Sequence, residues 1–160
     1  MKTFSAIVLA VTLSLTTAAA WAQFKVGSIE VTKPWSRATP AGAKVGAGYL
    51  EVTNRGTAPD RLVSLSTPAS GKAEIHEMAM RDGVMNMRAL PNGLEIAPGQ
   101  TVKLAPGGFH LMFVDLGAPL KQGQKFKATL VFEKAGSLDV TFDVEAIGAR
   151  APAGGGHSHH

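Results

Sequence analysis

Hydrophobic and polar residues alternate along most of the chain, and no segment of helical length carries an apolar stripe at i, i+3, i+4 and i+7. Short β-prone runs are separated by Gly, Pro, Asn and Asp, and they lie at 24–35, 46–54, 61–67, 72–78, 84–90, 101–106, 110–116, 125–133 and 138–147. Seven to nine strands at this spacing are typical of an antiparallel sandwich or a Greek-key barrel. The pattern therefore predicts an all-β domain.

The last two runs show the clearest alternation. The apolar side chains of each run share one face, and they are Phe126, Ala128, Leu130 and Phe132 in the first, and Leu138, Val140, Phe142 and Val144 in the second. We expect these runs to pair as a hairpin across Ala135-Gly136-Ser137. The chain then changes to "GARAPAGGGHSHH", which has nothing to bury, so a flexible tail is predicted at 149–160.

Residues 1–22 have the pattern of a cleavable signal peptide. Lys2 precedes an apolar stretch that ends in the small-x-small sequence Ala20-Trp21-Ala22. The unbroken apolar part, 4–15, is shorter than the roughly 20 residues that a membrane-spanning helix needs, and no second apolar run follows. We therefore expect an exported protein with no membrane span and a single domain at 23–148.

Composition excludes several classes of function. The sequence has no cysteine, which leaves no disulfide, no thiolate metal site, no thiol nucleophile and no cysteine to carry a lipid. The formal net charge of +4 is spread along the chain without a Lys/Arg run, so nucleic-acid binding is not indicated. No HExxH, glycine-rich phosphate loop or Ser-His-Asp arrangement is present, and Glu74, Glu77 and Asp82 are interpreted as a solvated or cross-strand set. We expect a protein that is not an enzyme.

The segment "EIHEMAMRDGVMNM" at 74–87 concentrates four methionines and a histidine. Its Asp82-Gly83 dipeptide predicts a type I′ turn, from which strand partners can be counted outward. Because side chains alternate between faces, one face receives His76, Met78, Met80, Met85 and Met87. The other face receives Glu77 and Arg88 as an opposite-charge pair. His76 and Met87 become diagonal neighbours, with Cα atoms about 7–8 Å apart.

A second element, "HLM", places His110 and Met112 two residues apart, on one face of a strand and about 6.6 Å apart along it. Neutral imidazole and thioether together form a soft, uncharged ligand set that favours Cu(I). A lone methionine in a strand more often fills a gap in the core. Two His/Met pairs, with the chain's other methionines gathered around them, favour ligation instead. Met78, Met80 and Met85 are secondary candidates.

The tail carries three more histidines, His157, His159 and His160. They are either solvated residues without a role or a cluster of imidazoles for Cu(II), Ni(II) or Zn(II).

These residues resemble the signature of the periplasmic copper chaperones of the PCu(A)C family, in which a histidine, ten residues, a methionine, about twenty-one residues and then His-x-Met follow one another. Here ten residues separate His76 from Met87, and twenty-two separate Met87 from His110. The extra residue is expected in a loop at 90–100. The resemblance covers nearly all of the domain, from "KPWSRATPAGAKVGAGYLEVTN" to "VTFDVEA".

The resemblance implies a cupredoxin-like β-barrel in the periplasm, with a Cu(I) site made by His76, Met87, His110 and Met112. It also implies delivery of copper to the copper domain of cytochrome c oxidase subunit II, directly or through a thiol-bearing assembly factor. In some members a His- or Met-rich tail is thought to take Cu(II). Two alternatives stay open: a copper buffer or tolerance protein without an acceptor, and a β-sandwich interaction module whose methionines are core residues.

Overall fold

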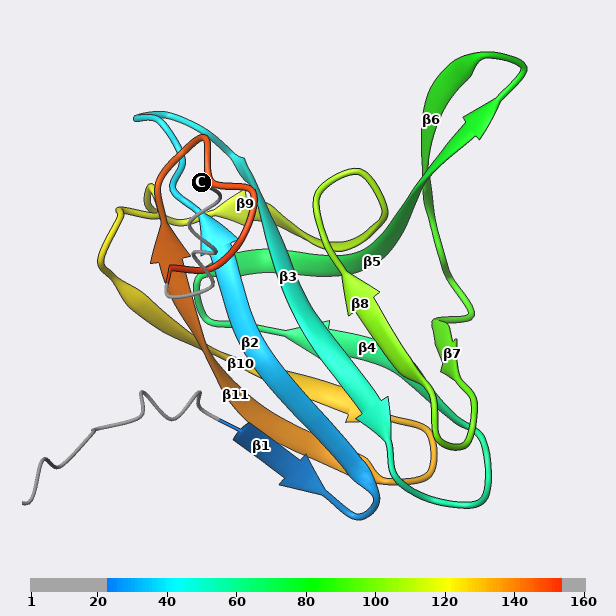
Figure 1. Cartoon of the computed structure of the whole chain (residues 1–160). Helices are drawn as coiled ribbons and strands as arrows, with labels where there is room; N and C mark the ends of the chain where they lie inside the picture. Colours follow the sequence, from blue (N-terminus) through cyan, green and yellow to red (C-terminus); the bar gives the residue numbers. More distant parts are fainter. Residues whose placement is uncertain (1–22, 154–160) are drawn as a thin grey trace, which may run out of the picture.

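The computed structural model describes residues 23–153, and this part of the chain is all-β, which confirms the predicted fold class (Figure 1). The predicted signal peptide and His157, His159 and His160 lie outside the described residues. The strands are β1 (Gln23–Val26), β2 (Ile29–Arg37), β3 (Val45–Asn54), β4 (Asp60–Ser66), β5 (Ser70–Arg81), β6 (Val84–Ala89), β7 (Leu94–Ile96), β8 (Thr101–Leu104), β9 (Phe109–Leu116), β10 (Lys125–Phe132) and β11 (Gly136–Glu145). Within 23–153 no helix is long and apolar enough to cross a membrane.

The described part of the chain has eleven strands, where the sequence pattern predicts seven to nine. The run at 24–35 divides into β1 and β2 because the chain turns at Gly27, whose φ of 54° lies in the left-handed region. The segment 90–100, expected to be a loop, contains the three-residue strand β7. A strand of three residues is too short for alternation to reveal it.

The strands form one sheet in the order β6-β5-β9-β3-β2-β11-β10-β4-β7, with β1 added to β2 and β8 added to β3. Among the described strands, β2 and β11 run parallel and every other pairing is antiparallel, so the antiparallel expectation holds except at this junction. The C-terminal hairpin forms as expected between β10 and β11. Its turn, however, is 133–135, because Gly136 already pairs with Phe132.

The sheet folds over so that strands from both of its ends contribute to one core. Figure 1 shows β2, β3 and β8 crossing in front of β4 and β10. The inward side chains of these strands belong to a single buried cluster that includes Val31, Val52, Leu62, Leu104 and Leu130. The alternation predicted for β10 and β11 is confirmed, since Ala128, Leu130, Phe132, Val140, Phe142 and Val144 are buried. Phe126 and Leu138 are partly buried and pack against the same core.

The core determines the position of β9, which lies between β3 and β5. Leu111 and Phe113 point inward and are fully buried, and the Phe113 ring packs edge-on against Phe142 at 5.8 Å. A Cβ on Gly48, the β3 partner of Leu111, would lie 2.7 Å from the Phe113 ring. A slip of β9 by one residue would turn Leu111 and Phe113 outward, so the packing also fixes which β9 side chains face away from the core.

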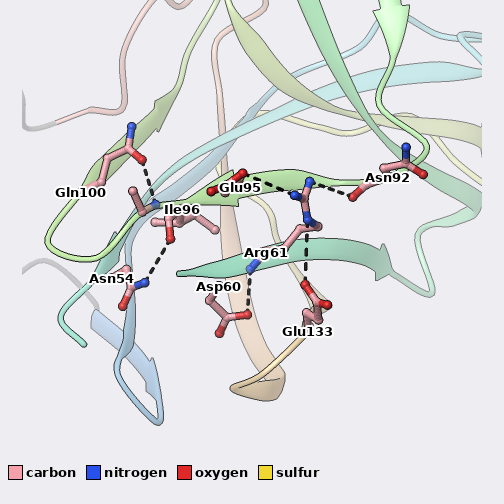
Figure 2. A network of polar contacts seen from close by, with 9 residues as sticks. Asn54, Asp60, Arg61, Asn92, Glu95, Ile96, Gln100 and Glu133 are labelled. Carbon is pink, nitrogen blue, oxygen red and sulfur yellow. Dashed lines mark hydrogen bonds and ion pairs between the residues drawn. The ribbon is translucent and has the colours of Figure 1, made fainter. Parts of the chain in front are cut away.

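A polar network holds the connection that carries the chain from β6 to β9 (Figure 2). The guanidinium of Arg61 on β4 donates to the Asn92 carbonyl at 3.2 Å and lies 3.4 Å from the Glu95 carboxylate. The amide of Asn54 donates to the Ile96 carbonyl at 3.0 Å. Together with the β4–β7 pairing, these contacts give this connection a defined path, although the sequence pattern suggested a loop.

Candidate metal centre

The β5–β6 hairpin has the register predicted by counting outward from its turn. Arg81 pairs with Val84, Met80 with Met85, Met78 with Met87, Glu77 with Arg88, and His76 with Ala89. Asp82 and Gly83 have φ values of 51° and 75°, as a type I′ turn requires at both central positions. On the face away from the methionines, Arg88 Nε donates to the Glu77 carboxylate at 2.7 Å. The predicted opposite-charge pair is therefore confirmed.

Strand β5 changes partners at His76, and this change brings the two histidines together. Residues 70–77 of β5 pair with β9, residues 76–81 pair with β6, and His76 is a partner both of His110 and of Ala89. The rings of His76 and His110 lie side by side, with centroids 5.6 Å apart and planes tilted by 48°. Both residues are buried, at 7% and 6% exposure. Beyond Glu77 the hairpin projects from the body of the sheet (Figure 1).

One nitrogen of the His110 ring is held by the backbone. Nδ1 lies 3.1 Å from the Gly108 carbonyl oxygen, and because a carbonyl only accepts, Nδ1 carries the proton. Burial lowers the pKa of His110, and the hydrogen bond to Gly108 opposes that shift only in part. A neutral ring with a proton on Nδ1 has its lone pair on Nε2. An imidazole whose second nitrogen donates to a backbone carbonyl is the usual arrangement of a histidine that ligates a metal.

His76 is held in the same way by a carboxylate. Its Nε2 lies 2.8 Å from Glu74 Oε2, and the other Glu74 oxygen forms an ion pair with Lys72. The Lys72 ammonium, with a further contribution from His76, holds the pKa of the Glu74 carboxyl below its usual range, so the carboxylate accepts and Nε2 donates. The other nitrogen, His76 Nδ1, is buried without a hydrogen-bond partner, the one such side-chain atom within 23–153. An unpartnered buried nitrogen is costly unless something binds it.

The sequence reasoning missed Glu74, which it grouped with solvated carboxylates. The signal was present, since Glu74 and His76 are two residues apart and must share a face of any strand. Glu74 is also the β9 partner of Met112. The outward face therefore carries two adjacent rows, His76 beside His110 and Glu74 beside Met112.

The structure places each of the predicted methionine ligands beside a histidine, but on opposite sides of the histidine pair. Met112 is half-buried on β9, two residues beyond His110, and Met87 is 50% exposed on β6, diagonal to His76. In a flat sheet this register separates the Cα atoms of Met87 and Met112 by about 16 Å, since they are two strands and four residues apart. A single ion that takes both sulfurs therefore requires the sheet to curl at the hairpin.

The secondary methionines lie on the same face of the hairpin. Met78 is half-buried, next to the histidines, whereas Met80 and Met85 form a pair at the exposed end, at 64% and 47% exposure. Within 23–153 no three His, Asp or Glu side chains are grouped so that they could hold a metal. The side chains gathered on this face are therefore two imidazoles with thioethers on either side, and such groups are soft, uncharged donors.

A cavity of about 550 Å³ lies between β2, β3, β8 and the segment after β11. It is lined by Trp35, Arg37, Lys103, Arg150 and eight neighbouring residues, and by none of the histidines or methionines described above. The Arg37 guanidinium holds the start of the C-terminal segment there, donating to the Ala149 carbonyl at 2.7 Å.

Comparison with known proteins identifies a family and a relative of this chain. The model of the LpqE-like family, described as "Putative lipoprotein LpqE-like", matches residues 29–144. A relative from Leifsonia xyli subsp. xyli, "Putative lipoprotein Lxx21020", is 33% identical over 117 residues, which are 73% of this chain and 69% of the relative.

Solved structures share the fold, among them two whose descriptions name copper. One is described as "Copper-bound PCuAC domain from PmoF2"; it is 30% identical with a TM-score of 0.67, and the match covers 78% of this chain and 98% of that one. The other is the solution structure of CuI-DR1885 from Deinococcus radiodurans, 27% identical with a TM-score of 0.60, over 75% of this chain and 78% of that one.

Proposed function

Because the chain belongs to the LpqE-like family and has the cupredoxin-like fold of the PCuAC domains, we propose that it is a copper chaperone that binds Cu(I) through His76, His110, Met87 and Met112. The observation that carries the proposal is the state of the two rings. Each buried imidazole has one nitrogen held by a hydrogen bond, which leaves the other nitrogen of a neutral ring as a lone-pair donor. The ring centroids are 5.6 Å apart, and thioethers lie on both sides.

The donor set supports Cu(I) over other cations. Thioethers are soft and uncharged, and they need no deprotonation, so the site adds no negative charge to attract Mg(II) or Ca(II). The absence of cysteine removes the thiolate that a blue-copper electron-transfer site needs. A structural zinc site of the usual thiolate kind is removed for the same reason.

Release by ligand exchange follows from the difference in exposure. The histidines are 7% and 6% exposed, whereas Met87 is 50% exposed on a projecting strand. An acceptor can therefore displace the Met87 thioether first, and then Met112, while the ion is still held by the imidazoles. The ion stays Cu(I) throughout, so the exchange requires no electron donor. The acceptor we propose is the copper domain of cytochrome c oxidase subunit II or a thiol-bearing assembly factor.

The location we propose is the periplasm, after removal of residues 1–22. The family match to proteins named lipoproteins supports export. We further propose that His157, His159 and His160 bind Cu(II).

An anaerobic titration against a colorimetric Cu(I) chelator tests the proposal. We expect the wild-type chain to compete for one Cu(I), and the His76→Ala/His110→Ala variant to lose this competition. Asn86→Ala, on the opposite face of the same hairpin, is the matched control. Equal affinity of the double variant and the wild type, with circular dichroism showing both folded, would contradict the proposal.

Transfer separates a chaperone from a copper buffer, which would have the same site. The Cu(I)-loaded chain is mixed with the purified copper domain of subunit II, and the metal content of each protein is measured after separation. Copper in the acceptor supports delivery. Copper that stays on the chain, while the same acceptor takes Cu(I) from a weak chelator, would support the buffer alternative.

A further inference from the structure

The β5–β6 hairpin carries three methionines that the proposed site does not use, two of them at its exposed end. Met78, Met80 and Met85 share a face of the hairpin, and we call them the tip methionines. Met80 is the direct partner of Met85, and Met78 is diagonal to Met85 and two residues from Met80. The three therefore form a triangle in which each member is a neighbour of the other two.

The backbone pairing brings these side chains close together. The Met78 amide donates to the Gly108 carbonyl at 3.0 Å, on the β9 side, so it does not bond to β6. Met78–Met87 is consequently a non-hydrogen-bonded pair, and so is Met80–Met85 two residues further along. In such pairs the Cα atoms are only about 4.5 Å apart and the side chains are closest. Flexible methionine side chains at this spacing can bring their sulfurs onto one ion.

Packing does not account for the outer two tip methionines. Met80 and Met85 are 64% and 47% exposed, every residue of β6 is exposed, and none of them belongs to the buried core. Large apolar side chains are unusual on a strand whose face meets water. The charged residues Glu77, Arg81 and Arg88 all project from the opposite face, so the methionine face of the paired hairpin strands carries no charged side chain between His76 and Ala89.

We propose that the tip methionines form a second Cu(I) site, held by three thioethers, through which the ion passes on its way to and from the histidine pair. Met78 is the link between the two sites, since it is half-buried and two residues from His76. The site is weaker than the first because it lacks imidazole donors and lies in water. This inference rests on the proposed function. It adds a route by which copper enters the histidine site from a donor and leaves it for an acceptor.

Binding at the tip is tested in a chain whose histidine site has been disabled. In His76→Ala/His110→Ala, we expect one weakly bound Cu(I) in an anaerobic titration with a low-affinity chelator. Adding Met80→Leu/Met85→Leu should abolish this equivalent, whereas adding Val84→Leu, at the same end but on the opposite face, should leave it. In the intact chain labelled at its methionine methyl groups, the Met80 and Met85 NMR signals should shift only after the first equivalent of Cu(I) is bound.

Two outcomes overturn the second site while leaving the proposed function intact. One is the absence of residual Cu(I) binding in His76→Ala/His110→Ala when the wild type binds Cu(I). The other is residual binding that survives Met80→Leu/Met85→Leu. The proposed function fails separately, if the wild-type affinity does not depend on the histidines. In the otherwise intact chain, Met80→Leu/Met85→Leu should keep the first-equivalent affinity and slow copper transfer to the acceptor; unchanged transfer would refute the path.

Discussion

Replacing Glu74 by glutamine tests whether the carboxylate behind His76 contributes to copper binding. The change keeps the size of the side chain and removes its charge. In the wild type, Glu74 Oε2 accepts from His76 Nε2 at 2.8 Å, and this hydrogen bond leaves the Nδ1 lone pair for a ligand. A glutamine amide can rotate to present its NH₂ group, which would favour a proton on Nδ1 and block that nitrogen. We therefore expect Glu74→Gln to weaken Cu(I) binding.

The size of the effect follows from the geometry of this hydrogen bond. Groups that orient a metal-ligating histidine typically contribute 10- to 100-fold to affinity, or about 1.4–2.8 kcal/mol. The Glu74 side chain is 26% exposed and shares its charge with Lys72, so solvent and the ion pair weaken its effect on His76. We expect a loss near the lower limit, about tenfold or 1.4 kcal/mol.

The measurement is an anaerobic Cu(I) competition at neutral pH, with Glu77→Gln as control. Glu77 is also a carboxylate of β5, but it pairs with Arg88 on the opposite face of the hairpin. The control should bind Cu(I) as the wild type does. If Glu74→Gln bound Cu(I) as tightly as Glu77→Gln, the carboxylate would have no part in orienting His76, and the reasoning about its ring nitrogens would be wrong.

Three further predictions concern the fold and the tail. Hydrogen bonding to Arg55, and the charges of Arg55 and Lys25, lower the pKa of Glu30, so Glu30→Gln should lower the unfolding midpoint at pH 7. The difference in midpoint between variant and wild type should vanish as the pH falls through the pKa of Glu30 in the folded state, and a difference that persists at pH 2 would contradict this. Gly48→Ala places a Cβ 2.7 Å from the Phe113 ring and should cost about 1–3 kcal/mol in urea unfolding, whereas Gly42→Ala, with open space at its Cβ, should avoid any clash and show only the strain of its positive φ. Removing residues 154–160 should abolish Cu(II) binding without disturbing the Ala153–Glu145 contact. Retained Cu(II) binding would exclude the tail histidines as the Cu(II) ligands.

The hairpin register and the core faces could be predicted because both depend on local rules. Asp82-Gly83 allows a two-residue turn, and this turn determines every partner from Arg81–Val84 to His76–Ala89. Alternation likewise identified the buried residues of β10 and β11. Each of these predictions requires only neighbours in sequence.

The neighbours of the hairpin could not be predicted from the same rules. His110 lies beside His76 because β9 inserts between β5 and β3. Both of these strands are far from β9 in the sequence. The spacing of the motif suggested that the two His/Met pairs belong together, but not that the histidines would be direct partners in the sheet. The hydrogen bond from Nδ1 of His110 to Gly108 is local, whereas the burial of the unpartnered Nδ1 of His76 depends on that pairing; neither could be seen in the sequence.

The core holds most of the proposed donors in place but leaves Met87 outside it. His110 and Met112 alternate with Leu111 and Phe113, which are fully buried, so moving these two donors would disturb the core. Met87 lies on β6, whose residues are all exposed. Among the described strands, β6 pairs only with β5. The cost of moving Met87 away from an ion is therefore small, whereas the cost of moving His110 is large. Under the proposed function the protein must hold Cu(I) and also release it, which requires both kinds of donor, and the projecting hairpin supplies the second.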